Sequence, residues 1–324
     1  MSVESETLLR IHRDMIRCRV FEDKHLELRD EGRTIVAWHH TRGAEGLCAV
    51  YSQLRDDDYC GYTHRIFYPW LCKGIPPSLL FAEACGKATG IARGRGGTHV
   101  ADPSRGILGR SAMQGGHFSV LTGAAIAAQL RGTDQVAVIT AGDGAMTSGI
   151  FHEAANHAMV WKLPVIFLCD NNGLSQTVPI SALWPHPDIA RIAGGYGMPA
   201  AIVPGSDPVA IAEAAASAIL RARAGEGPTL IEVKLVRWGT HFTGEPDLLG
   251  YQDPDQISRS MDADDPIVNL ERHLLQAGLI GDQTPSLVWT AAREEMEVAA
   301  RFAIESPEPD AANALDGIYA GELN

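Results

Sequence analysis

The chain has 324 residues and is 45% hydrophobic, which is enough for one large α/β domain or two small domains, and we expect one. Its net charge of -13 and its isoelectric point near 5.3 argue against a surface for nucleic acid or anionic membranes, although they allow a small basic pocket for phosphates. Six cysteines without a CxxC pair, an acidic N-terminus and the lack of an apolar run near about 18 residues predict a soluble, cytoplasmic protein with reduced, buried thiols.

In the first part of the chain, the spacing of apolar residues predicts helices over residues 6–29, 44–54, 76–87 and 118–130. His39 and His40 follow Trp38, and a histidine pair beside a tryptophan is by itself more typical of packing or of the surface than of chemistry. The three aspartates at 56–58 predict a solvated turn before a short strand. Arg65, after that strand, can serve as a bidentate phosphate donor or as a surface ion-pair partner.

Two glycine-punctuated loops follow, at residues 86–97 and 106–116. The first, GKATGIARGRGG, contains Lys87, Arg93 and Arg95. It is consistent either with a mobile linker or with a basic loop that an anion or a partner chain orders, and composition does not choose between them.

The centre of the chain, residues 135–180, predicts a strand, a turn, a helix and a second strand. A buried strand over 135–141 stops at Gly142-Asp143-Gly144, where the glycines permit a sharp turn. A helix over 148–161 and a second buried strand over 164–169 follow, and that strand ends at residues 170–173, which read DNNG. Two parallel neighbours therefore bring Asp143 and Asn172 to the same sheet edge, where open α/β sheets bind ligands.

A carboxylate, an amide oxygen and a backbone carbonyl after Asn172 make a hard-oxygen site suited to Mg²⁺ or Ca²⁺. Because Mg²⁺ takes many of its ligands from phosphates and water, such a site indicates a diphosphate-bearing ligand. The GDG alone is equally compatible with an ordinary βαβ turn whose aspartate caps a helix. The asparagine pair, separated from the GDG by the 26 residues from Ala145 to Asp170, favours the cofactor site.

Beyond the centre, strands are predicted over 200–203 and 229–236, and the alternation in the second suggests a position near the sheet edge. A helix over 209–222 begins after Asp207-Pro208. Residues 239–255 are predicted to be irregular, which indicates function or disorder. Helical patterns follow over 266–275, 286–304 and 311–319. We expect residues 1–260 to form the ligand-binding domain and 261–324 to be a helical extension of it.

These runs together resemble the alpha subunit of the thiamine-diphosphate-dependent first component of 2-oxo acid dehydrogenase complexes, in the acetoin and pyruvate dehydrogenase branch. The resemblance covers about residues 15–255 and rests on GDGAMTSGIFHEAANHAMVWKLPVIFLCDNN, GKATGIARGRGG, GILGRSAMQGGHFSVLTGAA, GGYGMP and RWGTHFTGE. It implies an α/β fold with a mostly parallel sheet, helices on both faces and a C-terminal helical extension.

The resemblance also implies roles for individual residues. Asp143, Asn172 and the backbone carbonyl of Leu174 would ligate Mg²⁺. The other implied cofactor contacts are the backbone N–H groups of Gly144 and Ala145, the side chains of Arg65 and His241 at the phosphates, and His39, Ala112 and Gln114. Met113 would support the bent cofactor.

Several positions depart from the pattern of the family, and they concern the substrate rather than the cofactor. Gln114 stands where an aliphatic residue normally contacts the aminopyrimidine, and His117 is unusual in its frame. His64 replaces a frequent tyrosine, as in acetoin-type members, and Leu174 replaces a tyrosine of which only the carbonyl is needed. Gln252 stands at the position of an arginine.

In the family, the glutamate that activates the cofactor belongs to a beta subunit, so the resemblance implies half an active site and an α2β2 assembly. It further implies a lipoyl-bearing acyltransferase as partner and acetoin or a 2-oxo acid as substrate. His241 would act in proton transfer during acyl transfer to a lipoyl group or only as a phosphate ligand. A lyase or synthase without lipoyl transfer and a non-catalytic cofactor-binding homologue are the alternatives. An NAD-dependent dehydrogenase is disfavoured because the chain has no GxGxxG that opens a helix.

Overall fold

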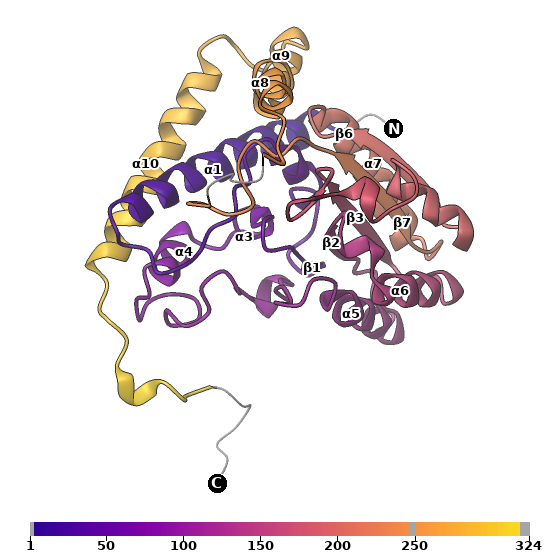
Figure 1. Ribbon diagram of the computed structural model, residues 1–324, viewed down its shortest axis with the longest axis horizontal. Helices are drawn as coiled ribbons and strands as arrows, with labels where there is room; N and C mark the ends of the chain where they lie inside the picture. The colour runs from indigo at the N-terminus through magenta and orange to yellow at the C-terminus, as the bar shows by residue number, and fades with distance from the viewer. Residues whose placement is uncertain (1–2, 246–249, 318–324) are drawn as a thin grey trace.

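The computed structural model describes residues 3–245 and 250–317. Its main sheet has five strands, and every neighbouring pair in it is parallel. The strand order is β1 (Tyr59–Gly61), β2 (Ala137–Gly142), β3 (Val165–Asn171), β7 (Thr229–Lys234) and β6 (Ala200–Pro204). Because the strands are parallel, their carboxyl ends lie at one edge, and the loops after β1, β2, β3 and β7 all begin there (Figure 1).

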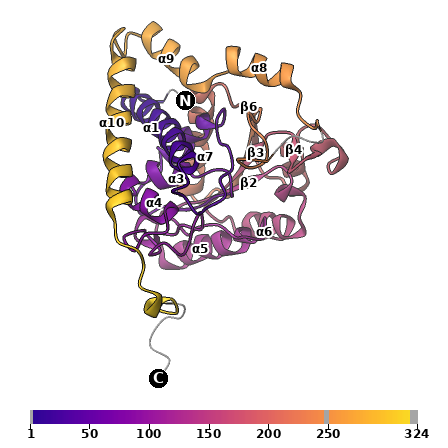
Figure 2. The same ribbon diagram turned by 60° about the vertical axis from the view of Figure 1, so that its left-hand side comes forward.

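Helices cover both faces of this sheet, as Figures 1 and 2 show. On one face, α5 (His117–Arg131) and α6 (Gly149–Val160) pack on the strands. On the other lie α1 (Ser5–Asp30), α2 (Cys48–Tyr51) and α7 (Pro208–Arg223). Alternate residues of the central strands enter the two cores, since Val138 and Ile166 pack with the second group of helices and Ile139 and Phe167 with the first. This burial on both faces is typical of parallel sheets.

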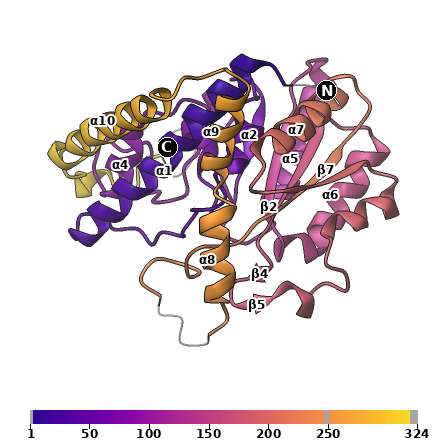
Figure 3. The same cartoon turned by 90° about the horizontal axis from the view of Figure 1, so that it is seen from above.

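The remaining helices surround this layered body. They are α3 (Tyr68–Cys72), α4 (Pro77–Ala84), α8 (Pro254–Ala263), α9 (Pro266–Gln276) and α10 (Thr284–Glu305). A short ribbon pairs β4 (Leu174–Ser175) with β5 (Val178–Pro179), and single turns of 3₁₀ helix cover Glu45–Leu47, Pro103–Arg105, Ala145–Thr147, Ile180–Ala182 and Ala311–Asn313, with a longer one over Ile189–Tyr196. Helix α10 packs along α1 and α4, and Figure 3 shows α8 extending from α9 toward the β4–β5 ribbon.

The structure confirms the α/β class, the parallel sheet and the helices expected from apolar spacing, with α2 ending earlier than expected, at Tyr51. Helices α3 and α8 escaped the sequence reasoning. Asp253 caps α8 by accepting from the N–H of Gln256, and Pro254 occupies its first turn, just as Asp207 and Pro208 begin α7. The capping aspartate and the following proline that indicate the start of α8 were therefore present in the sequence. Of the helix expected over 311–319, the described residues contain one 3₁₀ turn, and residues 318–319 lie outside them.

One expectation about a charged residue needs correction. Asp58 is fully buried rather than solvated, because its carboxylate accepts from the backbone N–H of Val136 and from Arg223 at 2.6 Å. The expected position of β7 near the sheet edge is confirmed, since it lies next to the edge strand β6. Its polar residue Glu232 is nevertheless fully buried and accepts from Asn171 Nδ2 at 2.6 Å, so this part of the polar alternation reflects a hydrogen-bond partner inside the protein.

The basic glycine-rich loop of residues 86–97 is ordered from within the chain. The carboxylate of Glu83, which is 1% exposed, accepts from the backbone N–H groups of Ala92, Gly94, Gly96 and Gly97 at 2.6 to 3.1 Å. An added Cβ at Gly90 would lie 2.5 Å from Glu83 Oε2, so the turn needs glycine for close approach. The anion that this loop encloses is therefore a side chain of the protein itself.

Among the described residues, none of the helices is both long and apolar enough for a membrane span.

Candidate active site

A cavity of about 420 Å³ lies at the carboxyl edge of the sheet, beside the ends of β2 and β3. Apart from Met113, every residue that the sequence assigned to the cofactor or the metal lines it: His39, Arg65, Ala112, Gln114, Asp143, Gly144, Ala145, Asn172, Leu174 and His241. These residues come from segments far apart in the sequence. The parallel strand order brings them together, because each loop leaves the sheet at the same edge.

Asp143 is held by the turn that follows β2. Its backbone N–H donates to the carbonyl of Asp170 at 3.1 Å, and its Oδ1 accepts from the N–H of Gly144 at 2.7 Å. Burial raises the pKa of this carboxyl, and Oδ2, also buried, makes no hydrogen bond within the described residues. At Gly144 an added Cβ would lie 2.2 Å from Ser175 Oγ, so only glycine lets the two loops approach.

The two adjacent asparagines have different environments. Asn171 donates through Nδ2 to Glu232 and accepts through Oδ1 from the N–H of Gly173 at 3.0 Å, so its amide is committed to the fold. Asn172 lines the cavity, and its buried Oδ1 makes no hydrogen bond in the described part of the chain. Buried polar oxygens are rarely left without a partner. The oxygens of Asp143 and Asn172 therefore have the chemistry of a site for a hard cation.

Three imidazoles form one wall of the cavity. The ring centroids of His39 and His64 are 4.4 Å apart, those of His39 and His241 4.9 Å, and those of His64 and His241 5.3 Å. Burial, with neighbouring positive charge, lowers the pKa to about 2 for His39, about 3 for His64 and about 4 for His241. All three rings are therefore neutral at pH 7.

Arg65 fixes the proton of His241. Its Nη1 donates to the carbonyl of His40 at 2.6 Å, and its Nη2 lies 3.1 Å from the carbonyl of His241 and 3.3 Å from Nδ1 of the same residue. A guanidinium has donors only, so Nδ1 of His241 accepts and the ring proton resides on Nε2. His241 thus offers an N–H donor.

This tautomer bears on what the histidine cluster can bind. The ring nitrogens of His39, His64 and His241 lie close enough to hold a metal ion, within 4.8 Å of one another. A metal would need an unprotonated nitrogen from each ring and would have to tolerate the positive charge of Arg65, whereas an anion would accept from Nε2–H and gain from that charge. The cluster therefore fits phosphate oxygens better than a transition metal.

The loop that carries His241 is tied to the loop that carries Leu174. Arg237 donates through Nη1 to the carbonyl of Gln176 at 3.0 Å and through Nε to that of Gly239 at 3.2 Å, and its guanidinium lies over the ring of Tyr251. Gln252, at the position of the expected arginine, donates to the carbonyl of Gly239 at 2.8 Å. The glutamine therefore still anchors this loop by hydrogen bonding. Part of the expected irregular segment, residues 246–249, lies outside the described residues.

The rim of the cavity differs from the sequence expectation. Gln114 and Ala112 are exposed at its mouth, and Met113, expected to support the cofactor, is 77% exposed and does not line the cavity. The sequence reasoning also missed Arg110 and Asp170 as lining residues. Burial raises the pKa of Asp170 to about 6 against the opposing charge of Arg65. The position of Asp170 directly before the asparagine pair, at the end of β3, was the feature of the sequence that could have indicated it as a lining residue.

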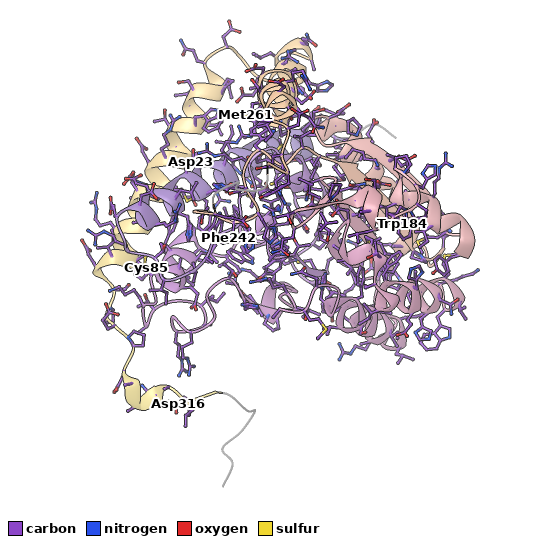
Figure 4. The ribbon with its side chains drawn as sticks, viewed as in Figure 1. Asp23, Cys85, Trp184, Phe242, Met261 and Asp316 are labelled. Atoms are coloured by element: carbon purple, nitrogen blue, oxygen red, sulfur yellow. The ribbon has the colours of Figure 1, made fainter. Side chains whose placement is uncertain are left out.

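A second cavity, of about 620 Å³, adjoins the first and shares Asn172 and Leu174 with it. It extends from β4 and β5 to α8 and includes Trp184, which Figure 4 labels to the right of Phe242, the neighbour of His241. Asp143, Arg65 and the three histidines do not line it. The convergent polar chemistry belongs to the smaller cavity.

Comparison with known proteins defines the class to which this fold and this site belong. Residues 12–312 match the family model described as the dehydrogenase E1 component, and the chain belongs to that family. Membership implies thiamine diphosphate as the cofactor.

Individual relatives share nearly the whole chain. The alpha subunit of the acetoin:2,6-dichlorophenolindophenol oxidoreductase of Bacillus subtilis is 35% identical in an alignment 324 residues long. The alignment covers 98% of this chain and 95% of the relative. The corresponding subunit of Cupriavidus necator is 33% identical, with 98% and 96% covered. The chloroplastic pyruvate dehydrogenase E1 component subunit alpha-3 of Oryza sativa subsp. japonica is also 33% identical, with 98% and 77% covered.

Proposed function

We propose that this chain is the alpha subunit of a thiamine-diphosphate-dependent enzyme that cleaves the carbon–carbon bond next to a carbonyl, in acetoin or in a 2-oxo acid such as pyruvate. The acyl group would pass to a lipoyl carrier on an acyltransferase, and a beta subunit would complete the site. Relatives named as alpha subunits of acetoin and pyruvate enzymes, aligned over nearly the full chain, support this assignment.

Mg²⁺ would be held by Asp143, Asn172 and the backbone carbonyl of Leu174. The observation that carries this proposal is the pair of buried oxygens, Asp143 Oδ2 and Asn172 Oδ1, that have no hydrogen-bond partner in the described chain although they line the same cavity. A cation between them would offset the cost of burying the carboxylate, which raises the pKa of Asp143.

The diphosphate would lie between the turn after β2 and the histidine wall. Ala145 would donate from the backbone at the start of a 3₁₀ turn, and Arg65 would add a buried positive charge. The N–H of Gly144, which donates to Asp143 Oδ1 at 2.7 Å, would be shared with a phosphate oxygen. His241 would donate from Nε2, and His39 would complete the wall beside it. Ala112 and Gln114, at the mouth, would face the part of the cofactor that reacts and the substrate.

The bound cofactor supplies the nucleophilic thiazolium carbon and the electron sink for the bond cleavage. The residues of this chain bind, orient and neutralise charge. With Nδ1 of His241 accepting from Arg65, the neutral ring can donate a hydrogen bond from Nε2, but loss of that proton would leave an imidazolate. A role as hydrogen-bond donor during acyl transfer is consistent with this tautomer. A role as general base would require the bond from Arg65 to Nδ1 to break.

The test compares the chain alone with the chain co-purified with its beta subunit. We expect the isolated chain to bind thiamine diphosphate weakly and to be inactive, and the pair to turn over one of acetoin, pyruvate or a branched 2-oxo acid. Full activity of the isolated chain would exclude the proposed division of the site. Capture of a lipoyl-bearing protein by the active pair would support the transfer step, and turnover without such a partner would favour a lyase or synthase.

A further inference from the structure

Three of the six cysteines meet at one point of the core, away from the cofactor cavity. Cys18 belongs to α1, Cys48 is the first residue of α2, and Cys72 is the last residue of α3. Their exposed fractions are 0%, 0% and 5%. Their Sγ atoms lie within 4.8 Å of one another, and those of Cys18 and Cys48 are 3.7 Å apart. We refer to these three residues as the thiol triad.

The separation of the Cys18 and Cys48 sulfurs, 3.7 Å, matches that of two sulfurs around a metal. With Zn–S bonds of about 2.3 Å, tetrahedral geometry places two sulfur ligands about 3.8 Å apart. Ser52 Oγ lies 3.8 Å from Cys72 Sγ and gives its proton to Asp14 Oδ2 at 2.9 Å, so its oxygen is left as an acceptor on the same side. Sulfur ligands of this kind select Zn²⁺ and related soft ions over Mg²⁺.

Positive charge lies beside the triad but is shared with carboxylates. Arg10 donates through Nη2 to the carbonyl of Cys72 at 3.4 Å, and Arg17 donates through Nη1 to the carbonyl of Leu71 at 3.5 Å. Both guanidiniums lie 3.8 Å from Asp14, and Arg17 also forms a bidentate pair with Glu295 at 2.7 and 2.8 Å. Binding of a divalent ion would release three thiol protons next to these ion pairs.

We propose that Cys18, Cys48 and Cys72 form a structural site for a zinc-class ion, with Ser52 as the oxygen neighbour. On binding, three sulfur–metal bonds form and the three thiol protons pass to solvent. The ion would join α1, α2 and α3, and so fix the two segments that leave these helices toward the cavity, those carrying His39 and Arg65. The competing interpretation is a cluster of neutral thiols that pack as small hydrophobic side chains.

Metal content of the full-length chain decides between these interpretations. We expect purified chain, or chain refolded with Zn²⁺ and freed of unbound ion by gel filtration, to carry about one zinc per chain by elemental analysis. Cys48→Ala should lose this ion. Cys85→Ala should keep it, because Cys85, labelled in Figure 4 at the end of α4, is buried outside the triad.

Refolding with Cd²⁺ gives a second measurement that needs no variant. A thiolate-to-cadmium absorption band in the ultraviolet, at one ion per chain, would support the site even if Cys48→Ala did not fold. Wild-type chain that retains only traces of Zn²⁺ and shows no such band would overturn the proposal. An ion retained equally by the Cys48→Ala and Cys85→Ala variants would overturn it as well, since that ion would be bound elsewhere.

Discussion

The glycine-rich loop of residues 86–97 and the turn after β2 look alike in sequence. In the structure they differ in whether the negative charge they enclose has hydrogen-bond partners. Both place glycines and backbone N–H groups around a negative charge. In the loop, that charge is the carboxylate of Glu83, which accepts from four N–H groups of the same chain. At the turn, Asp143 keeps a buried oxygen that no described residue contacts by a hydrogen bond.

This difference separates a structural anion from a functional one. A satisfied carboxylate holds a loop in place, and its interaction is complete without a ligand. An unsatisfied, buried oxygen raises the free energy of the folded chain until something binds it, so its retention indicates a ligand. Substitutions at each kind of site should distinguish the two roles, and the largest effect is expected at Asp143.

Asp143→Ala should abolish Mg²⁺-dependent binding of thiamine diphosphate, because the diphosphate charge would lose the ion that neutralises it. We expect a loss of affinity of at least about 100-fold, equivalent to about 2.7 kcal/mol. Calorimetry with cofactor and Mg²⁺ measures it. Asn171→Ala is not a suitable control because it removes a bond to Glu232, so Asp102→Ala serves instead, since Asp102 lies outside the cavity lining. Unchanged affinity in Asp143→Ala would reduce the GDG to a structural turn.

Glu83→Gln should lower the stability of the folded chain and leave cofactor binding unchanged. The amide would turn an NH₂ group toward backbone N–H donors, and we expect a loss of about 3 kcal/mol in the free energy of unfolding. Urea denaturation measures this. Glu308→Gln is the control, because Glu308 pairs with Lys87 at the surface of the same region and an exposed pair contributes less than about 1 kcal/mol. A fall in cofactor affinity at unchanged stability would contradict the structural role.

His25 tests whether an unsatisfied group outside a cavity behaves differently. It is fully buried against Trp38, and neither ring nitrogen has a hydrogen-bond partner among the described residues. Burial lowers the pKa of His25 from 6.5 to about 4. Between these values the unfolded chain binds a proton that the folded chain does not, so stability falls as the pH drops through this window.

His25→Phe should remove that pH dependence while keeping the ring contact with Trp38. We compare the free energy of unfolding of the variant with that of the parent. This difference, variant minus parent, should be about 2 kcal/mol larger at pH 5 than at pH 8. Urea unfolding at the two pH values measures the gain, with His157→Phe as a control at an exposed position. An equal change in the free energy of unfolding at both pH values would show that His25 does not titrate as its burial implies.

Gln114→Val should give the smallest effect, a several-fold change in the ratio of turnover on acetoin to turnover on pyruvate. Gln114 lies exposed at the mouth of the cavity in this chain, so we expect it to affect the substrate more than the affinity for the cofactor. Assays of the assembled enzyme measure both. If the ratio and the affinity are both unchanged, Gln114 has no part in substrate choice.

Much of the fold could be predicted from the sequence because parallel strands and amphipathic helices leave strong periodic signals. The strand-end positions of Asp143 and Asn172 were predictable for the same reason. The other cavity residues came from resemblance, since no local pattern places His39 and His241 in one wall. The partners of Asp58, Glu83 and Glu232 could not be predicted, because a buried carboxylate and a solvated one look alike until distant donors are brought to it.

The position of Gln114 shows a further limit on what can be predicted from one sequence. In the sequence it replaces an aliphatic residue, which suggests a buried polar group, but the described chain leaves it exposed. Burial at such a rim depends on a second polypeptide, and one sequence does not contain that surface. The missed helix α8 is a different case, because Asp253 and Pro254 gave a usable start signal.

The unequal asparagines at the end of β3 have a consequence for how this protein can evolve. Successive side chains of a strand point to opposite faces, so a shift of one residue exchanges their surroundings. A single-residue insertion in β3 would therefore offer the cavity Asn171 in place of Asn172 and deprive Glu232 of its partner. The length of β3 is therefore constrained by both asparagines at once, whereas residues 177–187 lie outside the main sheet and are not held to its pleat in this way.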